Sequence, residues 1–232
     1  MEQLAVLTPL EQLRAGRLGR RLPQLFVGLL LYGVSMGMLV RSTLGLDPWD
    51  VFHYGVAEKL PLSFGMVVIV VGLLVLLLWI PLRQMPGLGT VANAIVIGLA
   101  TDAALAVIPE PTAIAPRLLL LVSGVVLNGL AGALYIGAQL GPGPRDGLMT
   151  GLVRRTGLSV RLVRTTLELT VLSIGFALGG TVGLGTVVYA LSIGPLVQLM
   201  LPHLVVDLST RTETGRATAS APELKDLPTL ST

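Results

Sequence analysis

Glu168 is a carboxylate placed well inside an otherwise apolar stretch that begins near residue 160. A charge at that depth in a membrane is costly, so it is expected to serve a function or to have a partner. Arg164 precedes it by one helical turn and can pair with it. Two interpretations follow. The two residues form a structural ion pair, or Glu168 lines a cavity and binds a proton or a cationic group with an affinity set by Arg164.

Asn93 and Asp102 are secondary candidates for the same polar site, because both fall in the apolar stretch 88–108. Asp102 lies near the end of that stretch, where its carboxylate can also simply reach water. Together with Glu168 and Arg164, these residues form the candidate transport site.

His53 and His203 are the only two histidines of the chain. Neither has a second histidine, a cysteine or a carboxylate at the spacing of a metal site, so no metal is expected. No cofactor motif is present either. The sequence also lacks HExxH, GxSxG, paired histidines and a phosphate-binding loop, which argues against an enzyme.

A seven-residue pattern, Leu-Gly-x-x-Pro-x-Asp, occurs twice, as LGLDPWD at residues 44–50 and as LGPGPRD at residues 140–146. Each copy is followed by a stretch that is too short and too polar to cross a membrane. Each therefore predicts a short interfacial or re-entrant helix with proline at its first position. A second pattern, GLGT, also occurs twice, at 87–90 and at 183–186.

The residues of these patterns have two alternative roles, helix capping and gating of a substrate path. An aspartate just before the proline can cap the new helix, and a carboxylate in the first turn offsets the positive end of the helix dipole. The threonine of GLGT can cap in the same way. The candidates of this kind are Asp47, Pro48, Asp50, Pro144, Asp146, Thr90 and Thr186.

The composition places most of the chain in a bilayer. Of 232 residues, 53% are hydrophobic and 12% charged, and the mean hydropathy is +0.82. This exceeds the apolar content of soluble domains. The absence of cysteine excludes a disulfide framework. Six membrane spans fit the uncharged stretches, at about 23–40, 63–82, 88–108, 117–137, 160–179 and 185–206.

Shifting the chain by 96 residues superimposes both patterns without a gap. The shift also pairs Gly28 and Gly33 with Gly124 and Gly129, for which close helix packing is expected. Each repeat holds three spans, an odd number, so the second copy must enter the membrane the other way up. The inversion places LGLDPWD outside and LGPGPRD inside.

The expected fold is therefore an all-α polytopic membrane protein of about six transmembrane helices, arranged as two inverted three-helix repeats that each carry a short interfacial or re-entrant helix. Four parts are expected along the chain. These are a basic amphipathic cytoplasmic N-terminal segment (1–22), the first membrane repeat (23–108), the inverted second repeat (117–206) and a disordered cytoplasmic tail (207–232).

The distribution of basic residues predicts the orientation. In the six-span arrangement, thirteen of the 16 Lys and Arg residues fall on the side that holds both termini. Basic flanks are retained in the cytoplasm, so both termini are expected there. A capping box at Thr8–Glu11 predicts a basic amphipathic helix from Pro9 to Arg21 that can lie on anionic lipid or simply flank the first span.

Aromatic residues near the ends of the predicted spans are expected to anchor the protein at the membrane interfaces. They are Tyr32, Trp49, Tyr54, Trp79 and Tyr135.

The segments LGLDPWDVFHYG and GLGTVANAIVIGLATD resemble the signature of the YczE-like membrane proteins, a YczE/YyaS/YitT-type bacterial family of unestablished function. The resemblance covers roughly residues 22–206. It implies a multi-pass protein of the bacterial cytoplasmic membrane, and it implies no particular reaction, substrate or cofactor.

Two functions remain open from the sequence. The inverted repeats and buried polar groups favour a small-molecule transporter or exporter with a polar site between the repeats. The alternative is a non-transporting scaffold or an accessory subunit of another membrane complex. The expected partners are the lipid bilayer and a small-molecule or ion substrate. A homodimer is left open, and no nucleic acid is expected.

Overall fold

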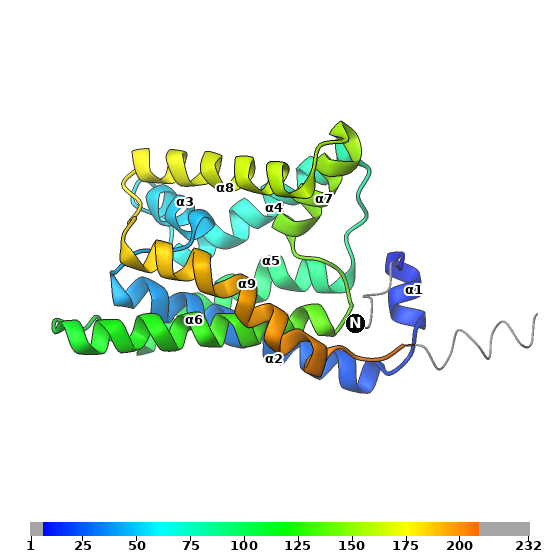
Figure 1. Ribbon diagram of the computed structural model, residues 1–232, viewed down its shortest axis with the longest axis horizontal. Coiled ribbons are helices and arrows are strands. Elements are labelled where there is room, and N and C mark those ends of the chain that lie inside the picture. The colour runs from blue at the N-terminus through cyan, green and yellow to red at the C-terminus, as the bar shows by residue number, and fades with distance from the viewer. Residues whose placement is uncertain (1–6, 209–232) are drawn as a thin grey trace, which may run out of the picture.

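The computed structural model describes residues 7–208, and these form nine helices without a strand (Figure 1). The helices are α1 (Pro9–Arg14), α2 (Leu18–Ser42), α3 (Pro48–Ala57), α4 (Phe64–Leu82), α5 (Leu88–Val107), α6 (Ile114–Gly137), α7 (Pro144–Thr156), α8 (Val160–Ala177) and α9 (Leu184–Leu204). Apart from its first two residues, the predicted disordered tail lies outside the described residues.

Six long helices coincide with the six predicted spans. Five of them, α2, α4, α5, α6 and α9, are long and apolar enough to cross a membrane. The remaining helix, α8, has 18 residues and carries Arg161, Arg164 and Glu168, which set it apart in composition. The prediction of a polytopic helical protein is confirmed, with five candidate spans among the described residues.

The sequence determines where several helices begin. Ser63 and Ser159 occupy equivalent positions under the 96-residue shift, and each caps a long helix. The hydroxyl of Ser63 accepts from the amide of Met66 at 3.2 Å, and that of Ser159 accepts from Leu162 at 3.3 Å. These bonds satisfy amides that have no partner inside the helix.

The N-terminal segment departs from the prediction. The capping box at Thr8 and Glu11 is present, but α1 ends at Arg14. Gly16 and Arg17 then adopt positive φ angles of 84° and 53°, so the predicted helix from Pro9 to Arg21 is broken. A left-handed conformation costs glycine little, which makes Gly16 a natural breaking point.

Arg21 explains why the chain turns here. It was expected on a basic surface that lies on anionic lipid or simply flanks the first span, but it is fully buried. Its guanidinium donates to the carbonyl oxygens of Ala138 at 2.8 Å and Gln139 at 2.7 Å, just beyond the end of α6. Carbonyls at a helix C-terminus lack partners and carry partial negative charge, so a cation stabilises them.

The two longest helices, α2 and α6, lie side by side along the molecule (Figure 1). The helix α5 packs against α2, and α9 packs against α6. The short helices cross between the two halves of the chain, since α3 packs against α8 and α7 against α4. The two halves of the chain differ in one pair of packed helices. The helix α4 packs along α5, while α8 has no packing of comparable extent against α9 within the described residues.

Glycines allow the closest approaches of α2. A methyl group on Gly33 would lie 2.6 Å from the carbonyl oxygen of Ile97 in α5, and one on Gly28 would lie 2.8 Å from the amide nitrogen of Tyr135 in α6. Small residues permit such contacts between helices in lipid. The expected role of Gly28 and Gly33 in close packing is confirmed.

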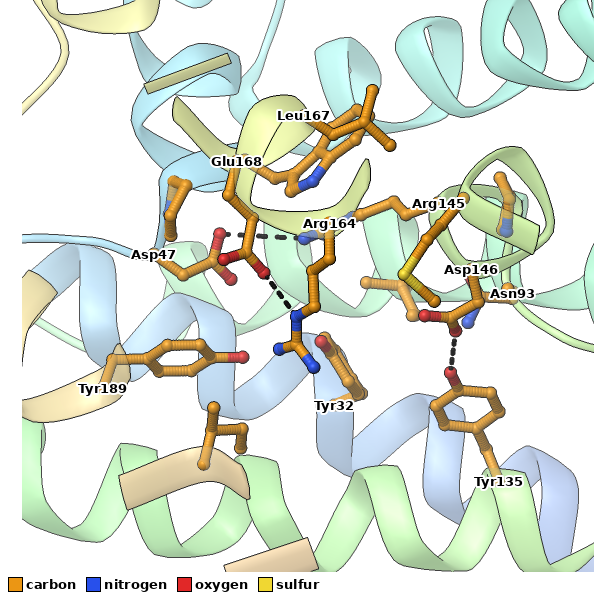
Figure 2. A pocket seen from close by; sticks show the side chains of 17 residues that line it. Tyr32, Asp47, Asn93, Tyr135, Arg145, Asp146, Arg164, Leu167, Glu168 and Tyr189 are labelled. Atoms are coloured by element: carbon orange, nitrogen blue, oxygen red, sulfur yellow. Dashed lines mark hydrogen bonds and ion pairs between the residues drawn. The ribbon is translucent and has the colours of Figure 1, made fainter. Parts of the chain in front are cut away.

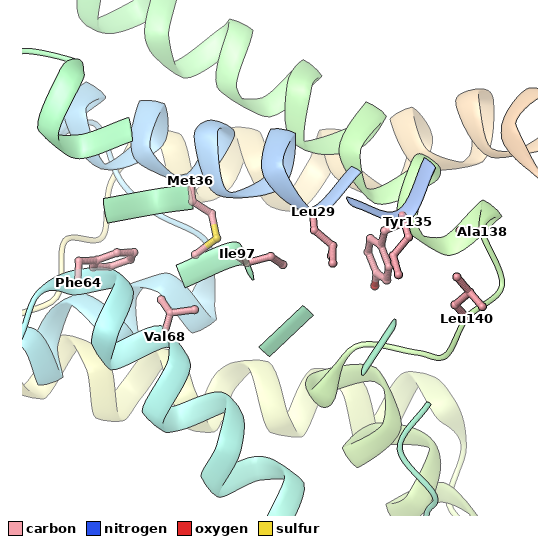
Figure 3. Packing of buried hydrophobic residues seen from close by; sticks show 9 residues of the cluster. Leu29, Met36, Phe64, Val68, Ile97, Tyr135, Ala138 and Leu140 are labelled. Carbon is pink, nitrogen blue, oxygen red and sulfur yellow. The ribbon is translucent and has the colours of Figure 1, made fainter. Parts of the chain in front are cut away.

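The main apolar core lies where α2, α4, α5 and α6 meet (Figure 3). It includes Leu29 and Met36 of α2, Val68 of α4 and Ile97 of α5. The outer faces of the long helices are also apolar. For example, Leu77 and Ile80 of α4 are exposed. An apolar exterior of this kind matches a hydrocarbon environment.

Candidate functional site

A cavity of about 210 Å³ lies among the helices of both halves of the chain, and Figure 2 shows the side chains that line it. It is lined by side chains from α2, α3, α5, α6, α7, α8 and α9, together with the residues that precede α3 and α7. The charged and aromatic residues of the lining are Asp47, Arg145, Asp146, Arg164, Glu168, Tyr32, Trp49, Tyr135 and Tyr189.

Many lining residues occupy equivalent positions in the two copies of the sequence repeat. Pro48 and Pro144 are one such pair, and both line the cavity. Ile97 and Ile193 are another pair, as are Asn93 and Tyr189. The cavity is thus bounded by the same parts of both repeats.

The first turns of α3 and α7 enter the cavity from the two halves of the chain. Asp47 caps α3, and its Oδ1 accepts from the amide of Asp50 at 2.9 Å. Gly143 takes the equivalent position before α7 and provides no side-chain cap. The positive ends of two helix dipoles therefore point at one space.

The GLGT patterns hold these entry points in place. The amide of Gly89 donates to the carbonyl oxygen of Leu140 at 2.7 Å. At the equivalent positions, the amide of Gly185 donates to Leu44, also at 2.7 Å. Each LGxxPxD segment is therefore bonded to the GLGT segment of the other copy, a contact that sequence inspection did not reveal.

Glycine is required at the centre of both contacts. Gly45 and Gly141 have φ angles of +118° and +119°, which disfavour other residues. A methyl group on Gly45 would also lie 2.7 Å from the amide nitrogen of Gly183. The recurrence of LGxxPxD and GLGT thus has a shared structural cause.

An ionic cluster joins the two short helices. Arg145 of α7 lies 3.6 Å from a carboxylate oxygen of Asp47 and 3.6 Å from one of Asp50. Its guanidinium carbon also lies 5.4 Å from the ring centre of Trp49, a cation–π arrangement. Arg145 and Trp49 are equivalent residues under the 96-residue shift, so this contact joins the same position of the two repeats.

Asp50 lies behind this cluster and is fully buried. Its Oδ1 is 3.2 Å from Nδ1 of His53, which is itself buried. Among the described residues, the other carboxylate oxygen has no hydrogen-bond partner. Asp50 thus supports Arg145 from outside the cavity wall.

The pair predicted on α8 is present. Nε of Arg164 donates to Oε1 of Glu168 at 2.9 Å, and both side chains reach the cavity, extending from α8 toward Tyr32 and Tyr189 (Figure 2). Both are also partly exposed, because α8 covers the cavity only from one side.

Hydrogen bonds orient two of the lining tyrosines. The hydroxyl of Tyr135 donates to Oδ2 of Asp146 at 2.8 Å. The hydroxyl of Tyr189 donates to Oδ1 of Asn128 at 2.9 Å, and Nδ2 of Asn128 donates to Ser35 at 2.8 Å. Such fully bonded buried groups keep the rings in fixed positions.

Within the described residues, no group of three His, Asp or Glu side chains is arranged to hold a metal ion. The cavity therefore has to be described by its charged, aromatic and helix-end groups alone.

A model of a family of unknown function, DUF6198, matches residues 19–202. The chain belongs to this family. No solved structure matches the chain significantly.

Three relatives extend the comparison. The chain is similar to an uncharacterized protein of Haemophilus influenzae, with 42% identity over 186 residues, which is 78% of this chain and 85% of the relative. It is 30% identical over 201 residues to the uncharacterized membrane protein YczE of Bacillus subtilis, covering 85% and 94% of the two chains. The uncharacterized protein YyaS of Bacillus subtilis is 23% identical over 180 residues, covering 76% and 90%.

These findings confirm the resemblance to YczE-like proteins. Together with five apolar helices of sufficient length, they make the DUF6198 chain a multi-pass membrane protein.

The structure brings most of the sequence candidates together. Seven of them line the cavity directly, and Asp50 lies beside it. Those seven are Asn93, Arg164 and Glu168 from the predicted polar site, with Asp47, Pro48, Pro144 and Asp146 from the repeated motif. Asp47 combines both roles, because it caps α3 and also lines the cavity.

Three candidates lie elsewhere and cap helices. Asp102 accepts from the amide of Gly65 at 2.7 Å and from the hydroxyl of Ser63, so it stabilises the start of α4. Thr90 accepts from Gly87 at 3.1 Å, and Thr186 accepts from Gly183 at 3.2 Å.

The two motifs, predicted to lie on opposite sides of the membrane, both contribute residues to one cavity. Pro48 and Pro144 border one cavity, because both short helices point their first turns inward. Arg145 also lines this cavity. Its pairing with Asp47 joins positions that are far apart in the sequence, so no local pattern could indicate it.

The aromatic residues were partly misinterpreted as interface anchors. Trp79 is buried, and its Nε1 donates to the carbonyl oxygen of Pro144 at 3.1 Å. Tyr32, Trp49 and Tyr135 line the cavity, and Tyr189 joins them. The matched short helices and the charged pair Arg164–Glu168 were the signals in the sequence that pointed to this region.

Proposed function

We propose that the protein is a small-molecule transporter or exporter, with the cavity between two inverted repeats as its binding site. The observation that carries the proposal is the lining of one cavity by equivalent residues of both repeats, Pro48 with Pro144 and Ile97 with Ile193. Transporters built from inverted repeats place their substrate site at the repeat interface, next to the ends of short or broken helices.

The inverted arrangement is supported by paired contacts. The bonds Gly89–Leu140 and Gly185–Leu44 exchange under the 96-residue shift and have the same length, 2.7 Å. The 96-residue shift also maps α3 onto α7 and α4 onto α8, so the packing of α3 on α8 and that of α7 on α4 are equivalent contacts.

In this proposal α8 is the sixth span. Its 18 residues rise about 27 Å at 1.5 Å per residue, close to the thickness of the hydrocarbon core.

The proposed orientation follows from the basic residues. The loop between α4 and α5 and the ends of α7 carry Arg83, Arg154 and Arg155, on the side proposed to hold both termini. The positive-inside rule makes this the cytoplasmic side of a bacterial membrane.

Glu168 is the proposed coupling residue. It binds a proton or a cationic group, and Arg164, 2.9 Å away, sets its affinity. Breaking this pair leaves both charges free to interact with an occupant of the cavity. In the proposed transport cycle, the Arg164–Glu168 pair opens and closes. This links the binding of substrate in the cavity to the position of α8.

Solute flux in proteoliposomes tests the proposal, using the purified protein alone, with and without a pH gradient. We expect flux by the wild type and its loss in Glu168→Gln, while that variant still accumulates in the membrane. Glu58→Gln is the matched control, because Glu58 is exposed beyond α3 and does not line the cavity. Normal flux in Glu168→Gln would remove Glu168 from the mechanism.

Absence of flux for a broad set of solutes, together with stable co-purification of another membrane protein, would instead favour a scaffold or accessory subunit. That result would refute the transport proposal as a whole.

The inversion has its own test. Lys59 and Arg155 are equivalent, exposed positions at the ends of α3 and α7, and the chain contains no cysteine. Lys59→Cys and Arg155→Cys therefore each provide a single thiol. We expect a membrane-impermeant reagent to label them from opposite sides. Labelling of both from one side would refute the inverted arrangement.

A further inference from the structure

The charges that line the cavity are unequal. Three carboxylates, from Asp47, Asp146 and Glu168, face two guanidiniums, from Arg145 and Arg164. With all of these groups charged, the lining carries one net negative charge. That excess favours a positively charged occupant.

The rest of the wall is unusually aromatic for this chain. The protein has four tyrosines and two tryptophans in all, and three of the tyrosines and one tryptophan line the cavity. Tyr32 and Tyr135 meet edge to face, with ring centres 6.2 Å apart. Rings of this kind attract cations through their negative faces, and cages of them bind quaternary ammonium groups.

The protein's own Arg145 shows that this wall accepts a cation. Its guanidinium lies over Trp49 at 5.4 Å and within 3.6 Å of both Asp47 and Asp50. A ring face and two carboxylates are thus already arranged around one positive charge. The two guanidiniums of the lining are both engaged with carboxylates, which leaves no unpaired cation for an anionic ligand.

From these observations we infer that the cavity binds a small organic cation, a molecule with one ammonium group and few other polar atoms. Its positive centre lies among the rings of Tyr32, Tyr135 and Tyr189, with Asp146 as the counter-charge. The cavity volume of about 210 Å³ lies below the roughly 300–1,000 Å³ of pockets for drug-sized ligands, which favours a ligand the size of a simple alkylammonium. The inference rests on the proposed function, because it names the substrate class of the same site.

Equilibrium dialysis of the purified full chain in detergent tests the inference, with radiolabelled tetramethylammonium and acetate as probes. We expect saturable binding of tetramethylammonium and none of acetate. Asp146→Asn keeps the size of the side chain and an acceptor for Tyr135, and it removes the charge. We expect it to weaken tetramethylammonium binding about tenfold.

The aromatic contribution has matched variants. Tyr189→Leu removes a ring face and should weaken binding about tenfold, while Tyr189→Phe keeps the ring and should stay within about threefold of the wild type. Tyr54→Leu is the control outside the cavity and should leave binding unchanged.

Arg145→Gln should change the affinity for tetramethylammonium in the opposite direction. It removes the internal cation that competes for Trp49 and Asp47, so tetramethylammonium should bind more tightly than in the wild type. A purely structural role for Arg145 would give weaker binding instead.

Binding of acetate in place of tetramethylammonium would overturn the inference, as would an affinity that neither Asp146→Asn nor Tyr189→Leu changes. If a variant does not fold, thermal unfolding of the wild type decides, because tetramethylammonium should raise its Tm and acetate should not. Flux of an anion without cation binding would leave transport standing and refute only this inference. Cation binding without any flux would refute transport and support the site.

Discussion

Gly98 and Gly194 are equivalent positions with opposite surroundings, and they allow a direct test of how the two halves differ. A methyl group on Gly98 in α5 would lie 2.4 Å from the carbonyl oxygen of Gly65 and 2.6 Å from Cγ1 of Ile69, both in α4. A methyl group on Gly194 in α9 would meet nothing within 4 Å. The contrast reflects the packing of α4 on α5, which has no counterpart of similar extent between α8 and α9 in residues 7–208.

The size of the effect follows from these distances. Ordinary van der Waals contact begins at 3.4 Å, so Gly98→Ala must separate α4 from α5 by about 1 Å. Overpacking of this kind costs about 1–3 kcal/mol, and the separated helices lose further contacts, so we expect a destabilisation of about 3 kcal/mol. In Gly194→Ala, the gain in helix propensity is offset by Pro195, which crowds a preceding Cβ. Its stability should change by less than about 1 kcal/mol.

Thermal unfolding of both variants in the same detergent micelles, followed by circular dichroism, provides the measurement. For a chain of this size, the expected difference corresponds to a Tm lower by roughly 10 °C for Gly98→Ala than for Gly194→Ala. Equal effects of the two substitutions would refute the reasoning. They would mean that α8 packs on α9 as tightly as α4 packs on α5, and α8 would then not be free to move with its ion pair.

Two further predictions concern charged residues outside the cavity. Arg21→Met should lower the free energy of unfolding by about 2–4 kcal/mol, measured by denaturant titration, because the carbonyls of Ala138 and Gln139 lose a charged donor. Unchanged stability would show that these bonds are replaced, and Arg20→Met, at an exposed position, is the control. Asp102→Asn should cost only about 1 kcal/mol and leave proteoliposome flux intact, because Asp102 caps α4 and does not reach the cavity. Loss of flux at normal stability would assign it a role in transport.

The sequence predicted the individual helices well, because the signals for them are local. Long uncharged stretches marked the long helices, and the prolines at positions 48 and 144 marked the starts of α3 and α7. The caps by Thr8 and Asp47 followed from side chains that reach amides three residues away. The exception was the break at Gly16, which depends on Arg21 reaching the end of α6 in three dimensions.

The site was harder to predict, because its contacts join distant parts of the chain. Glu168 and Arg164 were found, since a charged pair one turn apart inside an apolar stretch is visible in the sequence alone. The ion pair between Arg145 and Asp47 was not, since periodicity does not tell whether a short helix points its first turn inward or along the membrane surface. The same ambiguity affected Tyr135, because a tyrosine near a helix end suits both a lipid interface and a protein interior.

Access to the cavity from both sides of the membrane tests the central claim most directly, and the test needs no knowledge of the substrate. Ile193 lines the cavity, and Ile193→Cys introduces the only thiol of the chain. We would treat right-side-out and inside-out vesicles with a membrane-impermeant thiol reagent, with Lys59→Cys as the one-sided control. A transporter with alternating access predicts labelling of Ile193→Cys in both kinds of vesicle. Labelling in only one kind, or in neither, would contradict the account.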